Sequence, residues 1–345
     1  MDTKVYYTYN LDDTVLEEAA KYIKNGKTVV FPTETVYGLG ANALDKDACE
    51  KIFRAKGRPQ DNPLIVHVAN KDVSEYVNVI PKSAKVLMDK FWPGPLTIIF
   101  PKKDVIPDEI TGGLKSVAIR MPEGEIARKI ISLSGVPIAA PSANLSGKPS
   151  PTNIEHCIRD LSGRVNMIIG GQECRCGIES TVVEALENEV VILRPGEITP
   201  EMIKECGVKV SIDPTITKNL NNVAPKSPGM KYKHYAPDSE MTIVVGENKK
   251  VVEYINKQCD KIILSGKKVG VISTEENKHL YKGIVLSIGS RKNLKEVASK
   301  LFNVIREFDK LNVDYIFSEG FISEGVGLAI MNRLNKAAGH KIINL

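Results

Sequence analysis

The sequence predicts a chain of two α/β domains joined by a linker, and three observations support this prediction. The 345 residues are 42% hydrophobic and 26% charged, a composition typical of globular proteins. Short apolar runs and stretches of helical periodicity follow one another through most of the chain. Residues 212–240 are instead rich in Asp, Thr, Asn, Pro, Ser and Lys, as linkers are. We therefore expect domains over residues 1–211 and 241–345, with a linker over 212–240.

The first domain is expected to contain a twisted, mixed β-sheet. Its helices and strands are irregularly spaced, unlike a simple repeat of strand, helix and strand. Asp45 is placed to cap a short helix over 45–55, and residues 28–41 indicate a buried strand that runs into a glycine-containing loop. Further helical patterns occur at 14–27, 81–91, 123–134, 153–161 and 200–206, and further strand-like runs at 64–69, 96–100, 117–121, 136–140, 167–171, 181–186 and 190–196.

The second domain is expected to be a small Rossmann-like α/β domain with a parallel sheet. Strand-like runs alternate with helical patterns, as they do in parallel sheets whose strands are joined by crossover helices. The strand-like runs lie at 241–246, 268–274, 283–289 and 314–320, and the helical patterns at 248–259 and 293–311.

Charge and cysteine content limit the classes of function that the sequence can have. Residues 1–210 contain 26 Lys and Arg against 28 Asp and Glu, a net charge of −2, although the whole chain carries +5. The first domain therefore lacks the general basic character of a nucleic-acid platform and must bind any anion by local arrangement. Of the six cysteines, Cys174 and Cys176 form a CxC, which is a poor zinc half-site. We favour free thiols and predict no metal held by protein side chains.

The sequence also indicates a cytoplasmic location. No apolar run reaches the roughly 20 residues that span a bilayer. The first residues, MDTKVYYTYNLDD, include acidic side chains and lack the apolar core of a secretory signal. We therefore expect no membrane contact.

Several common catalytic motifs are absent from the sequence. It contains no GxxxxGK[ST], no GxGxxG, no GxSxG and no HExxH. We therefore predict a polar pocket that positions and neutralises anions, with no covalent nucleophile.

The segment PTETVYGLG (32–40) places hydroxyls at alternating positions. An extended backbone would bring those of Thr33, Thr35 and Tyr37 to one side. Half-exposed strands show the same alternation without any function, which leaves a structural alternative open.

The segment KGRPQDNPLIVH (56–67) combines cations with a proline-stiffened loop. Lys56 and Arg58 alternate around a glycine and would suit a triphosphate, and Asn62 adds a donor. His67 lies inside an apolar strand. The alternatives are a solvated turn for the cations and a satisfied core histidine for His67.

The segment PSANLSGKPSPT (141–152) follows an apolar run. Ser142 and Asn144 alternate, and Ser150 follows a glycine-containing turn. Small hydroxyls and backbone amides in such a turn can form an anion nest. An ordinary Ser- and Pro-rich loop is the alternative.

Four further residues lie at the ends of predicted strands. Ser180 and Thr181 open a strand, whereas Arg120 and Arg194 each close one. An arginine at such an end can bind an anion, but a salt bridge at the rim of the sheet is the alternative.

In order along the chain, these segments resemble the threonylcarbamoyl-AMP synthase family (YrdC-like) in its long, two-domain form. The matching segments are PTETVYGLG, KGRPQDNPL, FWPGPLT, SVAIRMP, PSANLSGKPSPT, ESTVV and LRPG, and SPGMKYKHYAP (227–237) marks the long form. Each motif is weak by itself, but seven in order are specific. The resemblance covers about residues 8–240, and the second domain matches only in size and placement.

The resemblance implies a synthase that joins L-threonine, bicarbonate or CO2, and ATP with Mg2+, and that releases pyrophosphate. Its product, threonylcarbamoyl-AMP, would be the donor for N6-threonylcarbamoyladenosine at tRNA position 37, so the tRNA threonylcarbamoyl transferase machinery is the expected partner. The family's nucleotide site corresponds to Lys56, Arg58, Asn62, Ser142, Asn144, Ser150, Arg194, His234 and Tyr235. Its threonine site corresponds to Thr35, His67, Arg120, the Ala140 backbone and Ser180, with Thr33, Tyr37 and Thr181 in support.

The segment SPGMKYKHYAP is expected to act as a lid. Pro228 and Pro237 would stiffen its ends, and Gly229 permits a sharp turn. His234 and Tyr235 would then shield a labile carbamate and adenylate from water. One departure from the family's pattern is Glu123–Gly124, where many relatives carry a polar or histidine-containing turn.

Two alternatives share this type of domain. One is a double-stranded RNA or tRNA-binding module without synthase activity, against which the near-neutral charge of residues 1–210 argues. The other is a carbamoyl-transfer domain of the hydrogenase-maturation type. That type is embedded in longer chains with acylphosphatase and zinc-finger units, and this sequence contains neither.

Overall fold

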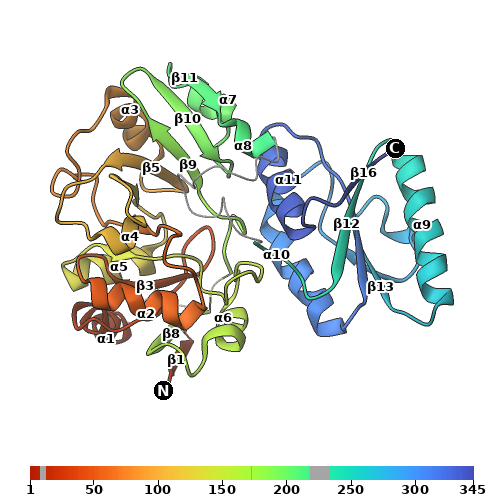
Figure 1. Cartoon of the computed structure of the whole chain (residues 1–345), viewed down its shortest axis with the longest axis horizontal. Coiled ribbons are helices and arrows are strands. Elements are labelled where there is room, and N and C mark those ends of the chain that lie inside the picture. Colours follow the sequence, from red (N-terminus) through yellow and green to blue (C-terminus); the bar gives the residue numbers. More distant parts are fainter. Residues whose placement is uncertain (8–12, 172, 218–233) are drawn as a thin grey trace. The chain divides into compact units, whose positions relative to one another are not determined.

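The computed structural model describes residues 1–7, 13–171, 173–217 and 234–345. It divides into two compact units: the first comprises Met1–Ser146 and Ser150–Tyr232, and the second comprises Gly147–Pro149 and Lys233–Leu345 (Figure 1). Each unit is described by itself. No helix among the described residues is long and apolar enough to cross a membrane.

The first unit is built on an eleven-stranded mixed sheet, as the sequence predicts. The strand order is β1-β8-β2-β3-β7-β4-β6-β5-β9-β10-β11. Parallel pairs such as β4 with β6 occur beside antiparallel pairs such as β5 with β6. The strands are β1 (Lys4–Tyr7), β2 (Val29–Phe31), β3 (Gly38–Asn42), β4 (Ile65–His67), β5 (Leu96–Pro101), β6 (Ser116–Arg120), β7 (Ile138–Ala139), β8 (Met167–Gly170), β9 (Thr181–Ala185), β10 (Glu189–Arg194) and β11 (Lys209–Ile212).

Helices of the first unit follow the predicted periodicity closely. They are α1 (Asp13–Lys24), α2 (Lys46–Lys56), α3 (Lys82–Phe91), α4 (Asp108–Thr111), α5 (Glu125–Ser134), α6 (Ile154–Leu161), α7 (Pro200–Lys204) and α8 (Pro214–Thr217). The predicted cap of α2 is confirmed, since the Asp45 side chain accepts hydrogen bonds from the amides of Asp47 and Ala48. The helix ends at Gly57, which adopts a left-handed φ of 60°. This end places Lys56 and Arg58 at the start of the next loop.

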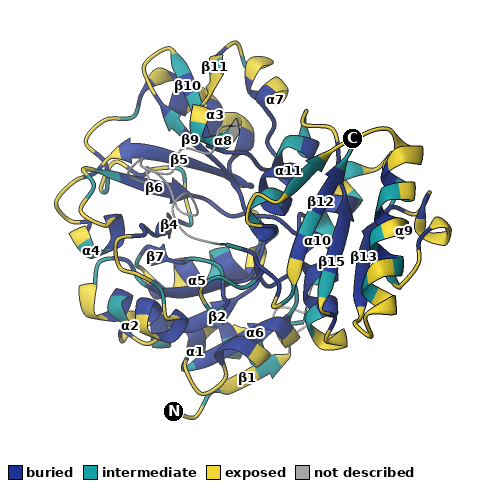
Figure 2. Ribbon diagram, turned by 45° about the vertical axis from the view of Figure 1, so that its right-hand side comes forward, coloured by how far each residue is buried: buried dark blue, intermediate teal, exposed yellow. Residues whose placement is uncertain are grey.

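The described apolar side chains of the first unit pack in separate clusters, two of which contain helices. Helices α1 and α5 share one core, in which Leu16 and Ile23 pack with Ile126 and Ile130. The other core contains Ile52 of α2 and Leu87 of α3, together with side chains of the sheet such as Ile98. Most residues of the central strands, such as β4, β5 and β6, are buried and appear dark blue in Figure 2.

The expectation of one strand running into a loop over residues 28–41 is wrong. The chain instead forms two antiparallel strands, β2 and β3, with Phe31 opposite Gly38. Because the chain must reverse between them, it bends at residues 34–36 instead of continuing as an extended segment. Gly40 lies within β3, where a side chain would meet the Phe31 ring at 2.6 Å, so the glycines here permit close packing.

The second unit contains a five-stranded, all-parallel sheet, as predicted. The strand order is β14-β13-β15-β12-β16. Helix α9 covers one face of this sheet, and α10 and α11 cover the other (Figures 1 and 2). The elements are β12 (Glu240–Val245), α9 (Asn248–Leu264), β13 (Val269–Ser273), a 3-10 turn η1 (Lys278–Leu280), β14 (Ile284–Ser287), α10 (Leu294–Leu311), β15 (Tyr315–Glu319), α11 (Val326–Ala337) and β16 (Ile342–Asn344).

Candidate active site

The register of the first sheet brings several predicted threonine-site residues together. His67 at the end of β4 lies opposite Arg120 at the end of β6. Arg120 lies in turn opposite Thr97 of β5. The Ala140 amide, which follows β7, donates a hydrogen bond of 2.9 Å to the Ile65 carbonyl. The polar side chains of His67, Arg120 and Thr97 therefore meet at one end of their strands, whereas Ala140 lies opposite Ile65, at the other end of β4.

Arg120 is the centre of this group. Its guanidinium donates hydrogen bonds to the Gly94 carbonyl (3.3 Å), to Thr35 Oγ1 (2.9 Å) and to Glu34 Oε1 (2.6 Å). The side chains of Arg120 and Glu34 are each 5% exposed. Burial alone would raise the pKa of the Glu34 carboxyl, but the charge and hydrogen bond of Arg120 outweigh it and lower that pKa. The pair is therefore ionised at neutral pH.

The hydroxyls of Thr33 and Thr35 continue this network. Because Thr35 Oγ1 accepts from Arg120, its own proton can be donated to Thr33 Oγ1 at 2.9 Å. Thr33 in turn donates to the Val36 carbonyl at 2.7 Å. The expectation that the Tyr37 hydroxyl lies on one side with them is wrong, because the backbone bends at residues 34–36. This hydroxyl is buried in the core, where it accepts a hydrogen bond from the Gly171 amide.

Glu34 is a further candidate site residue, which the sequence motifs did not indicate. It lies between the two threonines of PTETVYGLG. An acidic side chain enclosed by two candidate ligands in one motif was the signal available. Its role became visible only when the fold placed it against Arg120.

His67 is neutral in this environment. Burial, and then the positive charge of Arg120, lower its pKa to about 3. Its Nδ1 lies 3.2 Å from the Ile65 carbonyl, which can only accept, so Nδ1 must carry the proton. The neutral ring then presents Nε2 as a hydrogen-bond acceptor.

Ser180 joins the threonine-site group to a predicted nucleotide-site residue. Its hydroxyl lies 2.7 Å from Thr97 Oγ1 and accepts from the Arg194 guanidinium at 3.1 Å. Arg194 also donates to the Ser180 carbonyl at 3.0 Å. Thr181 is directed elsewhere, since its hydroxyl donates to the Ile198 carbonyl.

Lys56 ties helix α2 to the PSAN segment. Its buried ammonium donates to the carbonyls of Ser142 and Asn144, and it lies 3.5 Å from Asn144 Oδ1. This places three predicted nucleotide-site residues together. It also shows that Lys56 shapes the loop as well as supplying charge.

Arg58 and Asn62 form the neighbouring loop. The half-buried Arg58 donates to the carbonyls of Asn62 and Pro63 at 3.2 to 3.4 Å. Asn62 is 2% exposed, and its buried Oδ1 has no hydrogen-bond partner among the described residues. A buried acceptor of this kind costs free energy unless a ligand or water satisfies it. The loop therefore offers an unfilled polar position beside a cation.

The remaining predicted nucleotide-site residues lie in two places. Ser150 is fully buried in the first unit, where its hydroxyl donates to Glu179. His234 and Tyr235 belong to the second unit, where the Tyr235 ring stacks near Phe302 with a centroid distance of 5.0 Å. Of the expected lid over 227–237, only residues 234–237 are described, and Tyr232 lies outside the described residues.

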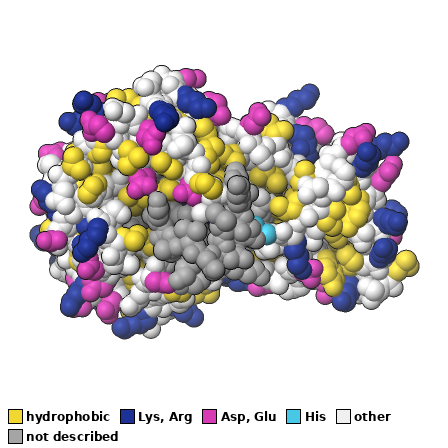
Figure 3. Space-filling view, turned by 45° about the horizontal axis from the view of Figure 1, so that its top comes forward, with side chains coloured by type: hydrophobic (Ala, Val, Ile, Leu, Met, Phe, Trp, Pro, Cys, Tyr) yellow, Lys and Arg dark blue, Asp and Glu magenta, His cyan; other side chains and the backbone are white. Residues whose placement is uncertain are grey.

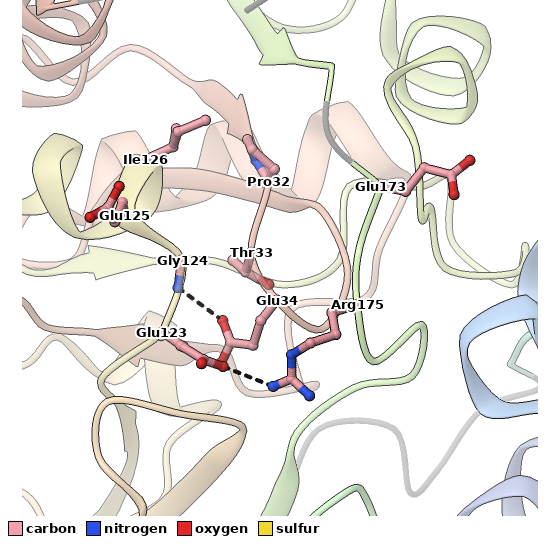
Figure 4. A pocket seen from close by; sticks show the side chains of 9 residues that line it. All are labelled: Pro32, Thr33, Glu34, Glu123, Gly124, Glu125, Ile126, Glu173 and Arg175. Atoms are coloured by element: carbon pink, nitrogen blue, oxygen red, sulfur yellow. Dashed lines mark hydrogen bonds and ion pairs between the residues drawn. The ribbon is translucent and has the colours of Figure 1, made fainter. Parts of the chain in front are cut away.

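A cavity of about 270 Å³ lies beside the Arg120 network (Figure 4). Glu34 and Thr33 form one wall, and the Gly124 amide donates to Glu34 Oε2 at 3.3 Å. Arg175 bridges Glu123 at 2.8 Å and Glu197 at 2.7 Å. The lining is Pro32, Thr33, Glu34, Glu123, Gly124, Glu125, Ile126, Glu173 and Arg175.

Charge elsewhere on the molecule is mixed. On the face drawn in Figure 3, basic side chains lie among acidic and apolar ones. Within the described ranges, no group of three or more His, Cys, Asp or Glu side chains could hold a metal ion.

Comparisons with known proteins decide the family. The family model described as "Telomere recombination" (Sua5, YciO and YrdC) matches residues 21–196, and the model described as "Threonylcarbamoyl-AMP synthase, C-terminal domain" matches residues 198–339. The threonylcarbamoyl-AMP synthase of Pyrococcus abyssi is 47% identical over 97% of both chains. This chain belongs to the threonylcarbamoyl-AMP synthase family.

Two further members of the threonylcarbamoyl-AMP synthase family extend the comparison. The Bacillus subtilis synthase is 46% identical over 96% of this chain and 95% of its own length. The crystal structure of Pyrococcus abyssi Sua5 complexed with L-threonine covers all of both chains, with 46% identity and a TM-score of 0.93. The resemblance drawn from the sequence motifs, and the two predicted types of α/β fold, are thereby confirmed.

Proposed function

We propose that this chain is a threonylcarbamoyl-AMP synthase, which joins L-threonine, bicarbonate or CO2, and ATP and releases pyrophosphate. The observation that carries the proposal is the 47% identity over 97% of both chains to a protein of that name. The threonine complex of a relative with a TM-score of 0.93 adds support. In this proposal the product is the donor for modification of tRNA position 37, and a threonylcarbamoyl transferase consumes it.

The threonine end of the site is proposed to be the Arg120 network. A guanidinium fork binds a carboxylate well, although the threonine carboxylate would have to share Arg120 with Glu34. The unprotonated Nε2 of His67 could accept a hydrogen bond from the threonine hydroxyl. Ser180, Thr35 and the Ala140 backbone would complete this end.

The ATP end is proposed to lie along the loops after α2 and β7. Arg58 and Lys56 supply positive charge, and the buried Oδ1 of Asn62 is an acceptor without a partner in the described structure. ATP would enter with Mg2+ on its phosphates, as a substrate complex. The residues assigned to this end are Lys56, Arg58, Asn62, Ser142, Asn144, Ser150 and Arg194, with His234 and Tyr235 as lid residues.

The proposed reaction has two bond-forming steps. The threonine amine first attacks CO2, forms a C–N bond and loses a proton, which gives a carbamate. A carbamate oxygen then attacks the α-phosphorus in line, and the bond from that phosphorus to the bridging oxygen breaks as pyrophosphate leaves. No covalent enzyme intermediate is needed, because position and charge neutralisation are sufficient.

A cytoplasmic location is part of the proposal. All six cysteines are free thiols, and five of them are buried. Free thiols are characteristic of reducing compartments.

The test is pyrophosphate release from ATP in the presence and absence of threonine and bicarbonate. We expect release to need both, and turnover that ignores threonine would rule the proposal out. Arg58→Ala should lose most of this activity, because its cation faces the proposed triphosphate position. Arg54→Ala is the matched control, since Arg54 lies on an exposed face of α2 one turn earlier.

A further inference from the structure

Three residues of the PSANLSGKPSPT motif belong to the second unit. Gly147–Pro149 is grouped with residues 233–345, although the motif on either side belongs to the first unit. The Ala236 amide donates to the Gly147 carbonyl at 2.9 Å. Lys148 forms an ion pair with Asp238. The second unit therefore holds this short segment from several directions.

Arg306 of α10 contacts Pro149, the residue directly before the predicted nucleotide residue Ser150. Its Nε donates to the Pro149 carbonyl at 3.0 Å, and its Nη2 donates to the same oxygen. Arg306 is only 4% exposed. Two charged donors on one oxygen restrict both the position and the direction of that carbonyl.

The geometry of the peptide bond carries this restriction to Ser150. The carbonyl oxygen of Pro149 and the amide N–H of Ser150 lie in one plane, because they share a peptide group. The described peptide bonds other than Trp92–Pro93 are trans, so the Ser150 N–H points away from the Pro149 oxygen. A guanidinium that fixes this oxygen also fixes the direction of the Ser150 amide and the start of its side chain.

We propose that Arg306 is a positioning residue for ATP: it orients the Pro149–Ser150 peptide and thereby the Ser150 amide and the start of the Ser150 side chain. This inference rests on the proposed function, in which Ser150 contacts the nucleotide. It assigns a defined task to helix α10 of the second unit. A lysine could replace the charge of Arg306 but not the two donors on one oxygen.

The experiment compares steady-state pyrophosphate release by the full-length wild type, Arg306→Lys and Lys310→Ala. Lys310 lies on the same helix, and its exposed side chain pairs with Glu307, so its removal serves as the control. We expect Arg306→Lys to raise the KM for ATP about ten-fold with little change in kcat, the pattern of lost binding energy. The KM for threonine should stay at the wild-type value, which a general loss of structure would not allow.

A second variant tests the same role in case Arg306→Lys fails to fold. Lys148→Ala removes another hold on the same segment: its close partner Asp238 is 65% exposed, and its second partner, the buried Asp309, keeps the hydrogen bond from the Asp238 amide. It should raise the KM for ATP in the same direction by a smaller factor. Wild-type ATP KM values in both variants, or equal rises in the KM for both substrates, would overturn the positioning role while leaving the synthase assignment intact. A wild type without threonine-dependent release would instead refute the proposed function, and the role of Arg306 with it.

Discussion

Each unit contains a buried glutamate paired with an arginine near the ends of its strands, yet the two pairs differ in their surroundings. In the first unit, Glu34 pairs with Arg120 and forms part of a cavity wall. In the second, Glu319 ends β15 and pairs with Arg291. The Glu319 carboxylate also accepts from Ser273, from the amide and hydroxyl of Thr274, and from Asn277.

The two pairs differ in the number of hydrogen-bond donors around the glutamate carboxylate. A carboxylate has about four lone-pair positions, and five donors from its own chain surround Glu319. Glu34 accepts from Arg120 and the Gly124 amide, and its remaining surroundings include open space. A buried acid–base pair at a strand end is therefore a structural hub when its own chain satisfies it, and a candidate site when a cavity adjoins it.

The largest expected effect is on the stability of the second unit. Glu319→Ala leaves several buried donors and the Arg291 charge without their acceptor, so it should lower the free energy of unfolding of that unit by about 3–5 kcal/mol. Hydrogen exchange of the β13 and β15 amides measures this loss. The fluorescence of Trp92, the only tryptophan in the chain, reports the first unit and should not change.

Glu275→Ala is the matched control for this change. Glu275 is an exposed acid in the loop after β13, and solvent screens its pair with Lys278, so its removal should change stability far less than Glu319→Ala. Equal losses in the two variants would mean that Glu319 is not a structural hub, and the contrast with Glu34 would disappear.

The second largest expected effect is a dependence of the first unit's stability on pH. His67 has a pKa of about 3 when folded and about 6.5 when unfolded, so the unfolded state binds more protons between these values. Stability is therefore fully present above about pH 6.5 and decreases as the pH falls toward 3. Between pH 7 and pH 5 the loss from this one group is about 2 kcal/mol.

Denaturant unfolding followed by Trp92 fluorescence measures that loss. His67→Gln should remove this part of the pH dependence, whereas His279→Gln, at an exposed position of the second unit, should retain it. Identical pH profiles for the wild type and His67→Gln would contradict the neutral, buried state of His67.

The smallest expected effect tests which of the two arginines serves a substrate. Arg120→Lys keeps the charge but loses the fork, so the KM for threonine should rise about ten-fold, or roughly 1.4 kcal/mol. Arg291→Lys in the second unit should leave it unchanged. If both variants or neither changed the threonine KM, the cavity beside Glu34 would not be what distinguishes the pairs.

Local sequence signals predicted most of the fold. Asp45 and the apolar spacing of α2 were sufficient to place that helix, because caps and amphipathic faces are local properties. The β2–β3 hairpin was missed, since the glycines of GLGAN suggested a loop. Only tertiary packing, with the Phe31 ring against Gly40, makes a strand of them.

The sequence predicts the kinds of residue in the candidate site but not the hydrogen bonds between them. The sequence indicates Lys56, Ser142 and Asn144 in two separate segments, and the structure joins them through the Lys56 ammonium. Thr33 and Thr35 do meet, but through a bend and not through strand alternation. Glu34 could not be recognised because its partner, Arg120, is distant in the sequence, and such pairings depend on the fold.

The membership of Gly147–Pro149 in the second unit also governs how the chain can be divided. A fragment that begins after the linker lacks this segment, so Arg306 would be left as a buried cation without the carbonyl it contacts here. Dividing the chain at a single position therefore cannot separate the two units. Any exchange of second units between relatives must carry three residues from the middle of the first unit's motif, so the two regions are expected to change together.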